Sequence, residues 1–229
     1  MRFVLLNTHQ LSEAWLYPYL NDDLHADTKV CIFILEELSA YEEEKEMVEQ
    51  QFKKGSRNYD ALVTPLLTYG IKEDNIIFSY AHDQDATGKI RGADVLFIYG
   101  RKDAYIYLGD ELKEEILQFD GLIIGIQLGA LIQMDEYYRI EEEEAGFEEG
   151  LGLLSGFSLV IDYEQTINQI KGIIRILEDK GGQVVLCPRK TGGLFIDETS
   201  LELLGDAFII DEGQLDELYQ AKWTMENWK

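Results

Sequence analysis

The segment that decides the fold lies at residues 121–132, which read GLIIGIQLGALI. An aliphatic run enters a Gly-x-Gln-x-Gly turn, and a second apolar run follows directly. The first run has the length of a buried strand, and glycines mark a sharp change of chain direction. The segment therefore predicts a buried strand that turns at once into a helix.

This turn has the shape of a nucleophile elbow, in which glycines flank a strained central residue that is exposed above a sheet. Gly125 and Gly129 are present, but Gln127 stands where the G-x-S-x-G motif has serine. A glutamine amide has no O–H or S–H group that a base could activate, so we expect no nucleophilic catalysis there. The Leu128 backbone N–H and the positive end of the following helix could instead bind a carboxylate, or be occupied by the Gln127 side chain. An ordinary strand-to-helix turn is the alternative.

Outward from this segment, short apolar runs alternate with helix-compatible segments. The runs lie at residues 2–7, 29–35, 75–80, 93–99 and 121–126, and the predicted helices at 41–54, 60–69, 110–119 and 128–139. Nearly continuous hydrophobicity in the runs indicates that both faces of the sheet are covered. We therefore expect an α/β fold with a doubly wound, mostly parallel sheet flanked by helices.

The pattern changes after about residue 150. An amphipathic helix is predicted at 165–180, and the short runs at 183–187, 193–196 and 207–210 are expected to add antiparallel strands at the sheet edge. The chain has only three prolines and no Gly/Ser-rich linker. We therefore expect residues 1–229 to form a single domain.

Composition excludes several classes of function. The formal net charge of −24 disfavours a nucleic-acid surface, which needs a basic stripe. No run is long enough for a membrane span or a signal-peptide core, so a cytoplasmic protein is expected. Cys31 and Cys187 lie in apolar runs and are interpreted as buried hydrophobic residues. The three histidines form no metal signature, so neither a metal nor a cofactor is expected.

Ligands of open parallel sheets bind beyond the carboxyl ends of the strands. The residues at these ends are Thr8, His9, Glu36, Glu37, His82, Asp83, Gly100, Arg101, Lys102 and Gln127. Each one alone is more typical of a solvated loop than of a site. Arg101 and Lys102 would favour an anion over a neutral peptide carbonyl.

Three segments occur in an order that points to a known family. They are 93–103, ADVLFIYGRKD; 125–130, GIQLGA; and 150–154, GLGLL, with VIDY at 160–163. Over most of its length the chain resembles the aspartyl dipeptidase and cyanophycinase family of serine peptidases, as a degenerate member. The resemblance implies a class I glutamine amidotransferase-like fold.

Carried over by position, the resemblance puts the catalytic serine on Gln127, the histidine on or beside Asp162, and the oxyanion glycines on Gly100-Arg101. The acidic triad member would lie within residues 139–149. The resemblance therefore implies a dipeptidase E-like protein that has lost its catalytic serine and histidine. Such a protein would bind a small anionic metabolite, an acidic peptide or a protein partner through Gly100, Arg101, Lys102, Gln127 and Leu128.

Two other hypotheses remain open at this point. The chain could be an active serine-type dipeptidase or related hydrolase with a substitute nucleophile, for which the nearest hydroxyls belong to Thr8, Ser155 and Ser158 and the bases to His9 and His82. It could also be an interaction protein, such as a homodimer, that uses the late aromatic residues Tyr219, Trp223 and Trp228. Packing of this C-terminal segment onto the chain's own sheet is the favoured explanation of those aromatic residues.

Overall fold

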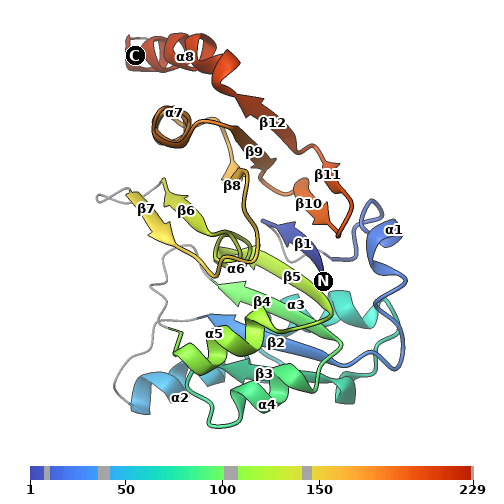
Figure 1. Cartoon of the computed structure of the whole chain (residues 1–229). Helices are drawn as coiled ribbons and strands as arrows, with labels where there is room; N and C mark the ends of the chain where they lie inside the picture. The colour runs from blue at the N-terminus through green and yellow to red at the C-terminus, as the bar shows by residue number, and fades with distance from the viewer. Residues whose placement is uncertain (8–10, 36–41, 101–107, 141–145, 228–229) are drawn as a thin grey trace. The chain divides into compact units, whose positions relative to one another are not determined.

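The computed structural model describes residues 1–7, 11–35, 42–100, 108–140 and 146–227 (Figure 1). The chain forms two compact units. One consists of Met1–Ala130 with Phe195–Glu202, and the other of Leu131–Leu194 with Leu203–Lys229. The single-domain organisation stays a prediction.

A seven-stranded sheet contains the five parallel strands of the first unit. Its order is β11-β10-β1-β5-β4-β2-β3, and the five strands from β1 to β3 are mutually parallel. The strands are β1 (Arg2–Leu6), β2 (Val30–Leu35), β3 (Ile76–Tyr80), β4 (Val95–Gly100), β5 (Leu122–Gln127), β10 (Gly192–Ile196) and β11 (Leu201–Gly205). All six residues of β2 are buried, as expected for a strand covered on both faces. The predicted mostly parallel α/β sheet is therefore confirmed.

Helices cover both faces of this sheet. They are α1 (Tyr17–Leu20), α2 (Glu42–Gln51), α3 (Arg57–Leu67), α4 (Ala86–Arg91), α5 (Asp110–Leu117) and α6 (Leu128–Leu131), with a 3₁₀ turn, η1, at Glu73–Asn75. Figure 1 shows α4 and α5 in front of the sheet and α3 behind it. Ser56 caps α3 by accepting a hydrogen bond from the Tyr59 N–H, which satisfies one of the free donors at the helix start.

The second unit is built around one amphipathic helix. Its elements are β6 (Glu136–Arg139), β7 (Gly146–Glu149), β8 (Ser158–Tyr163), α7 (Ile167–Lys180), β9 (Gln183–Pro188), β12 (Phe208–Asp211), the 3₁₀ turn η2 (Glu212–Gln214) and α8 (Leu215–Asn227). The apolar face of α7 supplies Ile173, Ile176 and Leu177 to a core shared with β8 and β9. The predicted amphipathic helix is confirmed, with its start at residue 167 instead of 165.

The helix predicted over residues 128–139 is wrong beyond its first turn. It ends at Leu131, and Glu136–Arg139 form β6, which pairs antiparallel with β7. The Arg139 guanidinium is buried and its Nε lies 3.2 Å from Glu148 Oε1 across this pair. Apolar spacing in 128–139 is compatible with a helix, but the cross-strand partner that favours β6 comes from residues further along the chain.

The expected positions of the later strands are only partly correct. β10 lies in the seven-stranded sheet, whereas β9 and β12 form a separate three-stranded sheet in the order β12-β9-β8. The residues after β12 form η2 and α8. Helix α8 packs against α7, and its Leu215 and Leu218 also contact the core cluster that includes residues of β8 and β9. Trp223 is 62% exposed on α8, and Trp228 lies outside the described residues. A homodimer or partner surface at these aromatic residues stays a prediction.

Both cysteines are buried, and neither forms a disulfide bond in the part of the chain that the structure describes. Burial raises the pKa of the Cys31 thiol to about 12 and that of the Cys187 thiol to about 12. Because the thiolate is the nucleophile, both thiols should be inert at pH 8. We expect iodoacetamide to label neither cysteine in the folded protein and both in 6 M guanidinium, as measured by mass spectrometry. Rapid labelling of either cysteine without denaturant would contradict this burial.

None of the helices in the described part of the chain combines the length and the apolar character that a membrane span requires.

Candidate functional site

The Gln127 turn has the backbone geometry of a nucleophile elbow. Gln127 ends β5 with a φ of 54°, in the left-handed region, and α6 begins at the next residue. The other described non-glycine residues with positive φ are Asp162, Gln165 and Lys190. A left-handed conformation at a non-glycine residue costs about 1–3 kcal/mol and persists only where the surroundings impose it. The turn therefore holds Gln127 in a strained position.

Close packing explains the glycine after Gln127. A Cβ at Gly129 would lie 2.1 Å from the carbonyl oxygen of Ile98, on the neighbouring strand β4. No side chain can enter that space without moving the backbone of β4 or α6. Glycine at this position therefore allows α6 to start directly against β4.

Three of the predicted site residues lie together at this turn. Gly100 is the register partner of Gln127 across β4 and β5, and a Cβ on Gly100 would be 3.3 Å from the Cβ of Leu128. Gly100 and Leu128 are buried, while Gln127 is partly exposed. Arg101 and Lys102 lie outside the described residues, so the predicted basic entrance to the site stays a prediction.

Helix α6 is shorter than expected, which weakens the predicted attraction of an anion by the positive end of this helix. The helix spans four residues, Leu128–Leu131, instead of the twelve expected. The helix dipole is a sum over aligned peptide units, so a single turn supplies little of it. Among the described residues at this turn, the donors available to an anion are the Leu128 backbone N–H and the Gln127 amide.

Asp162, the position that the resemblance assigns to histidine, lies in the second unit. It is in β8 with a φ of 58°, and its Oδ1 is 3.4 Å from Arg189 Nε. The side-chain amide of Gln169 donates to the Asp162 carbonyl oxygen at 2.8 Å. The Asp162 carboxylate thus forms an ion pair with Arg189. Because position 162 is not histidine, it provides no imidazole for general-base catalysis.

Among the described residues of the segment predicted to hold an acidic triad member, Glu148 makes contacts within the β6–β7 pair. Glu148 accepts a hydrogen bond from the Tyr137 hydroxyl at 2.8 Å and pairs with Arg139. Burial, together with this hydrogen bond, raises the pKa of Tyr137. These contacts join Glu148 of β7 to Tyr137 and Arg139 of β6 and so stabilise the pairing of the two strands.

The two substitute nucleophiles that the structure describes, Ser155 and Ser158, do not lie in an elbow. Ser155 is exposed and Ser158 begins β8, and neither has the left-handed backbone found at Gln127. Thr8 and His9 lie outside the described residues. His82 and Asp83 follow β3, where the structure adds two partners that the sequence analysis missed, Glu49 and Lys89. Glu49 is 33 residues from His82, and no local motif signals that contact.

Solved structures similar to this chain include two bacterial proteins. One is a peptidase from an acI-B1 Actinobacterium, with a TM-score of 0.60 and 15% sequence identity, covering 92% of this chain and 89% of that one. Another is a candidate peptidase E protein from Listeria monocytogenes EGD-e, with a TM-score of 0.55 and 15% identity, covering 88% of this chain and 96% of that one. No protein-family model and no curated protein sequence matches this chain. The similarity shows a peptidase E-like fold.

Proposed function

We propose that this chain is a non-catalytic relative of peptidase E-like proteins whose Gln127 turn binds a small ligand that carries a carboxylate. The fold is that of peptidases, and the proposed difference lies in the residue at the elbow. The observation that carries the proposal is the φ of 54° at Gln127. The strained geometry typical of a nucleophile is present around a side chain that cannot act as one.

The chemistry of Gln127 supports binding in place of catalysis. Its amide has two N–H donors and one acceptor oxygen, and neither group ionises near neutral pH. The neighbouring Leu128 N–H is at the first position of α6, where backbone donors have no partner within the helix. Two adjacent neutral donors can accept one carboxylate without a covalent step.

The experiment that tests this proposal measures hydrolysis of aspartyl dipeptides and aspartyl-arginine isopeptides from pH 5 to pH 9. Wild type, Gln127→Ala and Gln118→Ala are compared. Gln118 is exposed at the end of α5, so its replacement is a matched control for loss of a glutamine. We expect no turnover by any of the three proteins, because no ionisable nucleophile occupies the elbow.

A thermal-shift panel of small carboxylates and acidic peptides tests the binding part of the proposal. At least one ligand should raise the melting temperature of wild type and of Gln118→Ala, and the shift should be lost in Gln127→Ala. Turnover that disappears in Gln127→Ala would contradict the non-catalytic assignment. Ligand shifts that are equal in all three proteins would place the binding site elsewhere.

A further inference from the structure

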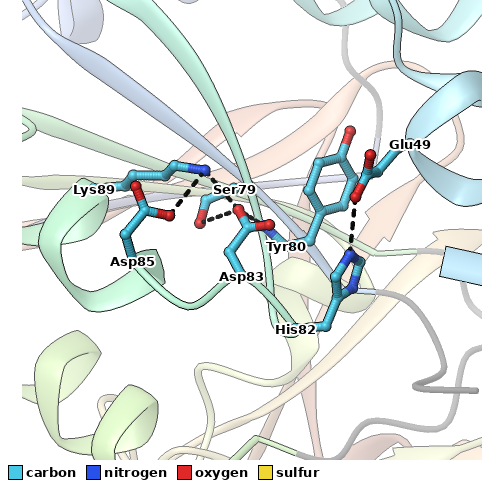
Figure 2. Close-up of polar contacts among 7 residues, drawn as sticks. All are labelled: Glu49, Ser79, Tyr80, His82, Asp83, Asp85 and Lys89. Carbon is cyan, nitrogen blue, oxygen red and sulfur yellow. Dashed lines mark hydrogen bonds and ion pairs between the residues drawn. The ribbon is translucent and has the colours of Figure 1, made fainter. Parts of the chain in front are cut away.

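A second group of polar side chains lies at the carboxyl end of β3, at the edge of the parallel sheet and apart from the Gln127 turn. Figure 2 shows His82 beside Glu49 of α2, and Asp83 beside Lys89 of α4. Strands β4 and β2 lie between β5 and β3 in the sheet order, which separates the two places by about 14 Å at the usual strand spacing. This group is therefore not part of the elbow.

We propose that Glu49, His82 and Asp83 bind one divalent transition-metal ion. One nitrogen or oxygen from each of the three side chains lies within 4.8 Å of the other two. His82 Nε2 is 3.2 Å from Glu49 Oε1. Ligand atoms around a tetrahedral zinc ion with bonds of about 2.0 Å are about 3.3 Å apart, so this pair already has the spacing of two ligands of one ion.

Neighbouring groups on β3 hold two of the three ligands in place. The His82 ring stacks on the Tyr80 ring, with the centroids 5.4 Å apart and 22° between the planes. Asp83 Oδ2 accepts hydrogen bonds from the Tyr80 backbone N–H at 3.0 Å and from the Ser79 hydroxyl at 3.4 Å, as Figure 2 shows. Metal-binding carboxylates are commonly fixed by such outer contacts. Within the described part of the chain, the hydrogen bonds and the ion pair of the Asp83 carboxylate use Oδ2, so the ion would bind through Oδ1.

The charges around the group favour a cation. Glu49 and Asp83 contribute two carboxylates, and Asp85 adds a third, whose Oδ1 lies 3.4 Å from Lys89 Nζ. The Lys89 ammonium, 2.7 Å from Asp83 Oδ2, is the one described cation in contact with this carboxylate. A divalent cation would balance the negative charge that Lys89 leaves uncompensated in this group. One imidazole with two carboxylates suits Zn²⁺, Co²⁺ or Mn²⁺ better than Mg²⁺ or Ca²⁺, which prefer oxygen ligands alone.

The sequence alone predicts no metal here because the three histidines lack the spacing of metal ligands. The ligand that completes the group is Glu49, which α2 brings next to β3 from far along the chain. Partial burial supports a specific site, since the side chains of His82 and Asp83 are both 15% exposed. A solvated acidic surface would leave these groups free in water.

The test titrates the full-length protein with Zn²⁺ by calorimetry in excess Mg²⁺, which saturates weak carboxylate binding on this acidic protein. Wild type should bind one equivalent. His82→Gln and Glu49→Gln should each weaken binding at least about tenfold. The matched control is His25→Gln, because His25 is exposed and distant in sequence from the group; its affinity should equal that of wild type. Visible absorption of bound Co²⁺ gives an independent readout of nitrogen ligation.

A variant that should raise the affinity for Zn²⁺ distinguishes a metal site from a general structural effect. Lys89→Met removes the cation that competes with the ion for Asp83, so Zn²⁺ should bind severalfold more tightly. Zn²⁺ should raise the melting temperature of wild type but not that of His82→Gln. Equal affinity of wild type and His82→Gln, or weaker binding by Lys89→Met, would overturn the proposal and leave His82 with an ordinary ion pair to Glu49.

Discussion

Gly129→Ala is expected to lower the free energy of unfolding by about 3 kcal/mol or more. The added methyl would be 2.1 Å from the Ile98 carbonyl oxygen and 2.7 Å from its carbonyl carbon, and both atoms belong to the backbone of a buried strand. Overpacking in a rigid core costs 1–3 kcal/mol or more, and here no rotamer change can relieve it. Urea denaturation followed by circular dichroism measures the change.

The matched control is Gly88→Ala in α4, where an added Cβ meets no atom within 4 Å. A helical alanine is more stable than glycine by about 0.5–1 kcal/mol, so this variant should gain stability. Opposite signs for the two Gly→Ala changes would confirm the close contact between α6 and β4. A loss below about 1 kcal/mol at Gly129 would mean that this contact does not hold the elbow.

Gln169→Ala is expected to destabilise the protein by about 3 kcal/mol. Gln169 is 2% exposed, and its amide oxygen accepts from the N–H groups of Glu164 at 2.8 Å and of Thr166 at 3.3 Å. Its amide nitrogen donates to the Asp162 carbonyl. Each buried backbone group that loses its partner costs about 1–3 kcal/mol, partly recovered where water enters. Residues 162 and 165 both have left-handed backbones, and without the Gln169 hydrogen bonds this strained loop is no longer held in place.

Two further variants show which part of this network matters. Thr166→Ala removes only the cap that accepts from the Gln169 N–H, so a loss of about 1 kcal/mol is expected. Gln118→Ala removes an exposed glutamine that bonds Glu114 within α5, and should change stability by less than about 0.5 kcal/mol. A Gln169→Ala loss no larger than that of Thr166→Ala would show that the loop does not depend on the buried amide. Thermal unfolding of the three variants decides this.

Much of the fold could be predicted from residue patterns. The runs that form β1, β2, β4 and β5 are almost entirely buried, as expected for apolar strands covered on both faces, whereas the apolar edge strand β3 leaves Ile77 39% exposed. The glycines around Gln127 predict the sharp turn, and the left-handed backbone at Gln127 agrees with the elbow interpretation. The isoleucines of α7 recur at helical spacing, and Ile170 and Ile174 are buried as expected.

The sequence by itself therefore determined which segments are buried and where the chain turns sharply, because burial and glycine conformation are encoded in local composition. Only the tertiary structure decided that α6 ends at Leu131, that β9 and β12 leave the main sheet, and that Glu49 meets His82. Each of these depends on a partner distant in sequence: β7 for β6, β8 for β9, and α2 for the end of β3. Periodicity reports the face that a segment buries, but not the segment that covers it.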